Sequence, residues 1–242
     1  MNLYELSFTS YIYTYLTKFD DTYKKFLDKT NSHLDLFNNS HRSYLLKWLN
    51  DWGCRNFYKS CHELASDEIL SWYKEYNNHI PTRETNIWEL KEKDLKLIQT
   101  AYDNLRLKRA SHIVKDGKDI IKGVGDTGSA KILFSLRPKS LIPWDGAMRK
   151  YFKKNYNISS YSSFLLKVME EVQELKKSCQ KEKFELLDIP SLFKKNNMTI
   201  PKLVDEYHWI RITNSFKLPD NKLLEKWINW NNNNKFKLPE DS

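Results

Sequence analysis

The chain has little cysteine, little glycine and no long apolar run. Its three cysteines, Cys54, Cys61 and Cys179, lie far apart without CxxC spacing, which excludes a disulfide framework and a four-thiolate metal site. No run of about 18 apolar residues occurs, and no basic segment precedes an apolar stretch near Met1. We therefore expect a cytoplasmic protein without a membrane partner.

Glycine and proline are also too scarce for a strand-rich protein. Six glycines and seven prolines punctuate 242 residues, and most apolar residues recur at spacings of three and four. This period predicts a nearly all-α fold with few strands. The clearest helices are expected from Asp94 to Leu107 and from Ser159 or Ser160 to Leu175. Weaker helical patterns cover roughly 4–28, 41–52, 66–77, 201–213 and 220–230.

The polar stretch from Pro81 to Asn86 suggests a boundary between two helical regions. We expect an N-terminal region at 1–85 and a second region at 86–230. The segment 231–242 contains four consecutive asparagines and is predicted to be a flexible tail.

Positive charge dominates the composition. Lys and Arg number 40 against 31 Asp and Glu, which gives a formal net charge of +9. Such a chain attracts polyanions, and nucleic acid is the commonest of these, although a solvated basic surface gives the same count. The motifs of P-loop enzymes, zinc proteases, α/β-hydrolases and zinc deaminases are absent, and the six histidines lack metal-site spacing. No catalytic metal is expected.

Three of the six glycines fall within the segment Gly123-Val124-Gly125-Asp126-Thr127-Gly128, between two expected helices. A Gly-hydrophobic-Gly turn permits positive φ and a close approach of the backbone to a ligand. The helix that follows offers free N–H groups to a phosphate, and Lys122 adds a charge beside it. An ordinary helix corner capped by glycine is the alternative.

A second motif, which contains an aspartate, follows the glycine cluster. The helix expected from Ser129 to Arg137 stops at Pro138, and Pro143-Trp144-Asp145 then opens another helix. The cassette 121–152 resembles the helix-hairpin-helix DNA glycosylase superfamily. Its members carry a Gly-hydrophobic-Gly hairpin, an apolar helix, and an aspartate a little over twenty residues beyond the first glycine. Gly123 and Asp145 are 22 positions apart.

The resemblance implies a two-lobed helical fold with a cleft between the lobes, and it implies roles for individual residues. Asp145 would be the catalytic carboxylate that stabilises an oxocarbenium-like sugar or deprotonates the attacking water. A role only as a helix N-cap is the alternative. DNA contacts would come from the hairpin, with a possible monovalent cation, and from one lysine further on: Lys122, Gly123, Val124, Gly125, Thr127, Gly128 and Lys150.

Three features of the sequence depart from the family pattern. Thr127 stands where the branches that also cut the DNA backbone place a Schiff-base lysine, which favours a monofunctional enzyme. Lys131 lies one turn later on the same helix face, so a displaced amine nucleophile is the alternative. The four-cysteine iron-sulfur motif of the endonuclease III branch is missing, and Lys122 replaces the proline that often precedes the hairpin. No cofactor beyond the hairpin cation is expected.

A flipped base needs flat or apolar walls. The candidate pocket residues are Trp144, which lies beside Asp145, and Trp52 and Arg55, which lie at the end of an expected helix. Packing between the lobes is their alternative role. The resemblance thus implies a nucleoid-associated DNA glycosylase that hydrolyses a damaged or modified base from double-stranded DNA, and no obligate protein partner is expected. A non-catalytic DNA-binding module is the alternative. Which base is removed is left open.

Overall fold

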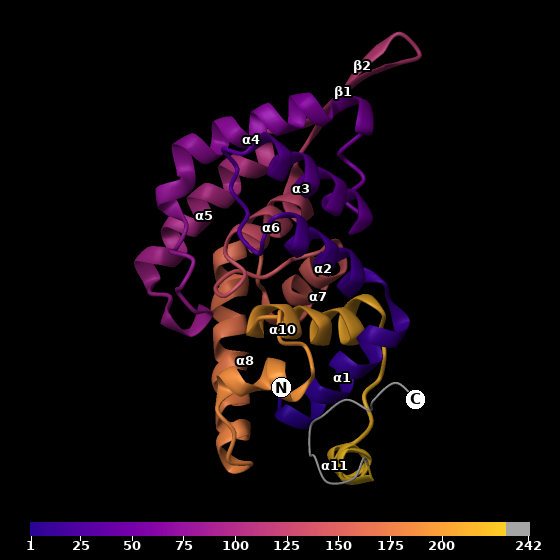
Figure 1. The fold of residues 1–242 in the computed structure, drawn as a ribbon, viewed down its shortest axis with the longest axis vertical. Helices are drawn as coiled ribbons and strands as arrows, with labels where there is room; N and C mark the ends of the chain where they lie inside the picture. Colours follow the sequence, from indigo (N-terminus) through magenta and orange to yellow (C-terminus); the bar gives the residue numbers. More distant parts are fainter. Residues whose placement is uncertain (231–242) are drawn as a thin grey trace.

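The computed structural model of the protein describes residues 1–230, and the expected tail at 231–242 lies outside the described residues. Helices dominate this part of the chain (Figure 1). The eleven α-helices within residues 1–230 are α1 (Leu3–Leu16), α2 (Phe19–Lys29), α3 (Asn39–Asp51), α4 (His62–Tyr76), α5 (Glu92–Leu107), α6 (Gly125–Leu136), α7 (Gly146–Tyr156), α8 (Tyr161–Lys181), α9 (Ile189–Leu192), α10 (Ile200–His208) and α11 (Asn221–Trp230). The expectation of a mostly helical fold is confirmed.

Several helices begin at the polar residues that the sequence indicates. The Ser160 hydroxyl accepts the backbone N–H of Ser163 at the start of α8. The Thr199 hydroxyl accepts the N–H of Lys202 at the start of α10, where Pro201 occupies the first turn. Each cap satisfies a backbone donor that has no partner within its own helix. The sequence therefore sets these boundaries locally.

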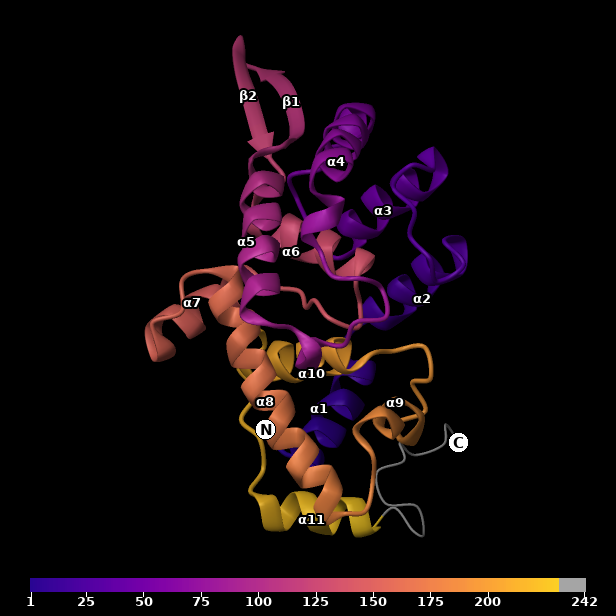
Figure 2. The same ribbon diagram turned by 90° about the vertical axis from the view of Figure 1, so that its left-hand side faces the viewer.

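One hydrophobic cluster runs through the described helices, from Leu3 in α1 to Ile228 in α11. The N-terminal helix α1 packs against α10 and α11, whereas α2 packs against α3 and α5 packs against α6 and α8. Figures 1 and 2 show α1 at the same end of the molecule as the C-terminal helices. Helix α1 therefore contacts elements from the far end of the chain.

A β-hairpin interrupts the helices directly before the glycine cluster. Strands β1 (Arg109–Lys115) and β2 (Lys118–Gly123) pair antiparallel and project beyond the helices (Figures 1 and 2). They turn at Asp116 and Gly117, whose φ values of 52° and 71° are those of a two-residue hairpin turn. The sequence analysis expected a helix on either side of the cluster, and it did not predict the two strands that precede the cluster. The Asp-Gly pair was the overlooked sequence signal.

The hairpin nevertheless leaves two helices joined at their ends. The Val124 N–H donates to the Lys108 carbonyl at 2.7 Å, so the chain re-enters the helical body where α5 ends. A Cβ on Gly123 would lie 2.9 Å from the Arg106 carbonyl oxygen, so only glycine fits this close approach. Helices α5 and α6 are thus adjacent across the segment 123–125, and the strands extend outward from their junction.

Candidate active site

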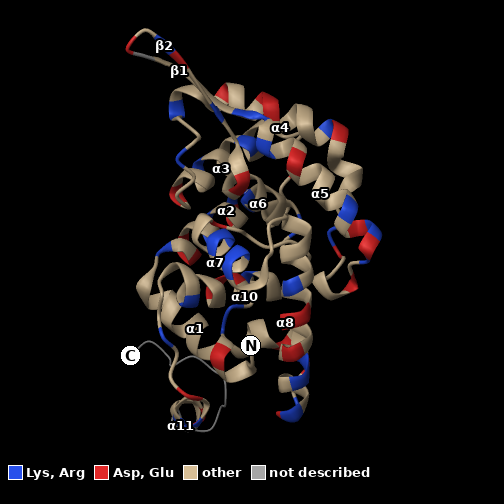
Figure 3. Ribbon diagram, turned by 180° about the vertical axis from the view of Figure 1, so that it is seen from behind, with Lys and Arg blue, Asp and Glu red and all other residues tan. Residues whose placement is uncertain are grey.

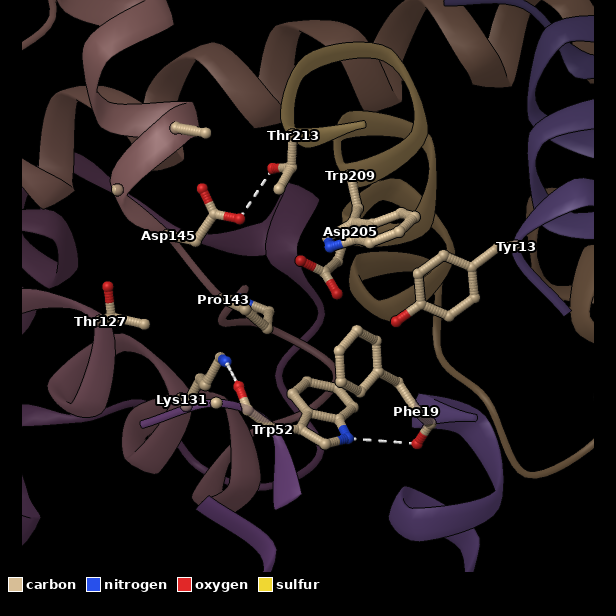
Figure 4. A pocket seen from close by; sticks show the side chains of 13 residues that line it. Tyr13, Phe19, Trp52, Thr127, Lys131, Pro143, Asp145, Asp205, Trp209 and Thr213 are labelled. Carbon is tan, nitrogen blue, oxygen red and sulfur yellow. Dashed lines mark hydrogen bonds between the residues drawn. The ribbon is translucent and has the colours of Figure 1, made fainter. Parts of the chain in front are cut away.

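A cavity of about 330 Å³ lies between α1, α2, α6, α7 and α10. Figure 4 shows its walls, which combine aromatic rings with two carboxylates and one ammonium group. Its lining residues come from distant parts of the chain: Tyr13, Phe19, Trp52, Gly53, Thr127, Lys131, Pro143, Asp145, Gly146, Ala147, Asp205, Trp209 and Thr213. Its size suits one flat ring system.

Asp145 lies at the rim of the cavity, at the N-terminus of α7. Its Oδ1 accepts the Met148 N–H at 2.8 Å, so it caps the helix, and its Oδ2 accepts the Thr213 hydroxyl at 2.7 Å. The carboxylate is therefore held at both oxygens, and the N-terminal end of the helix dipole favours its negative charge. Capping and exposure to the cavity occur together at this residue.

The Thr213 contact depends on an unusual helical segment. Residues Trp209–Thr213, which continue α10, form a π-helix, a rare conformation that is frequent at functional sites. Trp209 and Thr213 are its first and last residues, and both line the cavity. The wider turn therefore supplies an aromatic wall and a hydrogen-bond donor to Asp145.

Lys131 supplies a positive charge to the cavity wall. It is only 9% exposed, and its Nζ donates to the backbone carbonyl of Trp52. The same Nζ lies 5.4 Å from the centroid of the Trp52 ring. Trp52 itself is buried and donates its Nε1–H to the Phe19 carbonyl, so both the ring and the ammonium group have fixed positions.

Asp205 on α10 is a second carboxyl at the cavity, and the sequence analysis missed it. It is 5% exposed, and no described residue donates a hydrogen bond to its carboxylate. Burial disfavours the charged form and raises the pKa of Asp205 to about 7, against the opposing effects of Lys202 and Lys131, while Asp145 adds to the rise. Two carboxyls with different environments thus share one cavity.

A ring of buried charges lies behind Asp205. Lys202 contacts Asp20 at 2.9 Å and Glu206 at 2.8 Å, and Lys195 contacts the same two carboxylates at 2.7 Å and 2.8 Å. Lys202 and Glu206 are fully buried. Two positive and two negative charges alternate, so the ring is neutral as a whole and leaves Asp205 without a paired cation of its own.

The glycine corner and Asp145 lie close together in space. Arg149, one turn after Asp145, donates to the Thr127 hydroxyl at 3.0 Å and lies 3.6 Å from Asp126. The same guanidinium donates to the Trp144 carbonyl at 2.9 Å. Arg149 therefore joins the first turn of α6 to the start of α7, which brings the two halves of the 22-residue spacing into one site.

The glycines at this corner have definite structural reasons. Gly125 has a φ of +71°, which favours glycine. A Cβ on Gly128 would meet Val124 at 3.1 Å and Phe57 at 3.2 Å. The Gly123 carbonyl accepts a hydrogen bond from Asn56 at 2.9 Å. A hairpin cation would share this carbonyl with Asn56.

Four other candidates lie away from the cavity. Trp144, an expected pocket wall, is buried, stacks on Phe164 at 5.0 Å and does not line this cavity. Arg55 and Lys150 are exposed and do not line the cavity. Lys122 donates to the Tyr58 hydroxyl at 2.8 Å at the base of the β-hairpin.

Within residues 1–230, no group of three or more His, Cys, Asp or Glu side chains is arranged to hold a metal ion. Within the same range, no helix has the length and apolar character needed to cross a membrane. The three cysteines are buried and not bonded to one another. Compared with known family models, curated proteins and solved structures, the chain gives no match.

Proposed function

We propose that this protein is a DNA glycosylase of the helix-hairpin-helix type, in which Asp145 drives hydrolytic excision of a flipped base. One observation carries the proposal: Asp145 borders an aromatic-lined cavity and is joined through Arg149 to the glycine corner. A nucleotide whose phosphate meets the corner would therefore present its sugar to Asp145 and its base to the cavity. The cleft of a two-lobed glycosylase would then be the space that this cavity occupies.

The charge next to the cavity supports a polyanionic ligand. Helix α7 starts at the cavity and carries three exposed lysines, Lys150, Lys153 and Lys154, which we name the α7 lysines. The helix contains no acidic residue, and none of the α7 lysines forms an ion pair with another described residue. Figure 3 shows this basic helix from behind. Phosphates of a duplex would neutralise these charges.

The carboxylate geometry supports the chemistry. Departure of a base builds positive charge at the sugar, and a carboxylate fixed by two hydrogen bonds stabilises that charge without reorganising. Asp145 is also able to take the proton of the water that adds to the sugar. A lyase step through Lys131 is the competing proposal; it would require Lys131 to leave the Trp52 carbonyl before forming a Schiff base.

The test uses duplex oligonucleotides that each contain one modified base, with abasic sites detected by alkaline cleavage under single-turnover conditions. The expected result is excision by the wild type and a loss of about 10²-fold or more in rate for Asp145→Asn. Asp28→Asn is the matched control, because Asp28 is exposed on α2 and does not line the cavity. Its rate is expected to equal that of the wild type.

The alternative functions predict different results in this assay. Salt-sensitive duplex binding without excision of any base would indicate a non-catalytic DNA-binding module. Unchanged excision by Asp145→Asn would remove the proposed mechanism. A borohydride-trapped adduct that disappears in Lys131→Gln would assign a lyase step to this chain.

A further inference from the structure

The Asp205 carboxyl lines the cavity without a hydrogen-bond or ion-pair partner among the residues that the structure describes. Within residues 1–230 it has no hydrogen-bond donor and no ion pair within contact distance, although it is almost fully buried. A carboxyl that lines a cavity and has no protein partner is available to a ligand in that cavity. Figure 4 shows its carboxylate directed into the cavity, between Pro143 and Tyr13.

The groups around Asp205 come from several elements. Their charges nearly balance, because the ring of Lys195, Lys202, Asp20 and Glu206 is neutral, and Lys131 and Asp145 oppose each other. The titratable neighbours are Lys202 and Glu206 on α10, Lys131 on α6, Asp145 before α7, Tyr13 on α1, Tyr23 on α2 and Tyr161 on α8. Burial therefore decides the state of Asp205, and it favours the protonated acid.

We propose that Asp205 is the general acid of the reaction, which donates its proton to the departing base, and that the substrate is consequently an electrically neutral base. The inference rests on the proposed function and deepens it. Asp145 would stabilise the positive charge on the sugar, and Asp205 would protonate the leaving base.

The step balances in atoms and electrons. The bond between the sugar C1′ and the base nitrogen breaks, and its electron pair stays with the base. The base takes the Asp205 proton at one of its ring nitrogens or exocyclic oxygens. Water adds its oxygen to C1′ and gives a proton to Asp145. The products are the neutral base and an abasic sugar, and both carboxyls regain their starting states by proton exchange with water.

The position of Lys131 favours a neutral base over a cationic one. Its ammonium group is fixed in the same wall, so a base that already carries a positive charge would be repelled within the cavity. A cationic base also needs no proton from Asp205 in order to leave. A neutral base needs that proton and also offers acceptor atoms to both Lys131 and protonated Asp205. The polar groups of the cavity thus match an oxidised, deaminated or hydroxylated base.

The experiment compares duplexes that contain 8-oxoguanine, hypoxanthine, uracil or 5-hydroxymethyluracil with a duplex that contains the cationic 7-methylguanine. Single-turnover rates are measured from pH 5 to pH 9 for the wild type, Asp205→Asn and Lys131→Met. The asparagine side chain keeps the shape of the neutral acid but has no proton to give. Salt-sensitive binding to an unmodified duplex reports that each variant retains its fold.

We expect the wild-type enzyme to excise a neutral base. The rate of excision should decline as pH rises above about 7, where Asp205 loses its proton. Asp205→Asn should lower that rate by about 10²-fold to 10⁴-fold and abolish the decline. Lys131→Met should raise excision of 7-methylguanine relative to the neutral bases by roughly tenfold or more.

The outcomes separate this inference from the proposed function. If the wild type excises a base and Asp145→Asn does not, while Asp205→Asn keeps the wild-type rate and pH profile, Asp205 is no acid and only this inference fails. Preferential excision of 7-methylguanine by the wild type would overturn the substrate class. Excision of no base in the panel would contradict the proposed function, and this inference would fall with it.

Discussion

Replacing Asp205 by asparagine should stabilise the protein, and the gain should grow with pH. In the folded chain the pKa of Asp205 is raised by burial to about 7, whereas an unfolded aspartate has its ordinary value of 3.8. The unfolded state therefore loses its proton first as pH rises, so ionisation favours unfolding between these two values. The difference of about 3 units corresponds to roughly 4 kcal/mol of free energy of unfolding.

The sign follows from which state holds the proton. At pH 3 and below, both states are mostly protonated, so the cost of the carboxyl is small. As pH rises to about 7 the folded protein keeps its proton and its free energy of unfolding falls; above that value the cost is complete. Roughly 2–3 kcal/mol of the loss should occur between pH 5 and pH 8. Asparagine does not ionise, so the variant should not show this loss.

Urea denaturation of the wild type and of Asp205→Asn at pH 5 and at pH 8 measures the effect. All other groups titrate in both proteins, so the difference between the two free energies of unfolding isolates Asp205. We expect that difference to increase by about 2–3 kcal/mol in favour of the variant at pH 8. A difference that is constant between the two pH values would refute the reasoning. A stability gain together with lost activity would be the trade-off expected of a functional residue.

Three further predictions concern the buried charges, the core and the basic helix. Lys202→Met should lower the free energy of unfolding by about 3–5 kcal/mol in urea titrations, because Glu206 and Asp20 then share only one cation; Lys202→Met/Glu206→Gln should recover part of the loss. Trp144→Ala should cost about 3–5 kcal/mol by the same measurement, because it removes the ring stacked on Phe164. Changing the α7 lysines to glutamine should reduce the slope of log affinity against log salt for duplex DNA by about 2–3.

Each of these three predictions would be contradicted by one outcome. Full stability of Lys202→Met would mean that the charge ring contributes nothing, and full stability of Trp144→Ala would mean that its ring is not part of the core. An unchanged salt slope would place the duplex away from α7.

The sequence determined the features that depend on neighbouring residues. Helix period and the hydroxyls of Ser160 and Thr199 predicted elements that the structure contains, because caps and amphipathic faces act within one or two turns. The glycine cluster and the position of Asp145 at a helix start were likewise readable from residue type and spacing. The β-hairpin before the cluster was readable too, from Asp116-Gly117, and was overlooked.

Only the tertiary structure decided which side chains meet at the cavity. Thr213 reaches Asp145 across 68 positions, and Asp205 arrives on the same helical segment, so no local pattern marks either residue. Trp144 could not be assigned from sequence, because it is both large enough for the core and flat enough for a base. Around Asp145 the backbone is extended, and successive side chains there point to opposite sides. Pro143 and Asp145 therefore line the cavity while Trp144 enters the core.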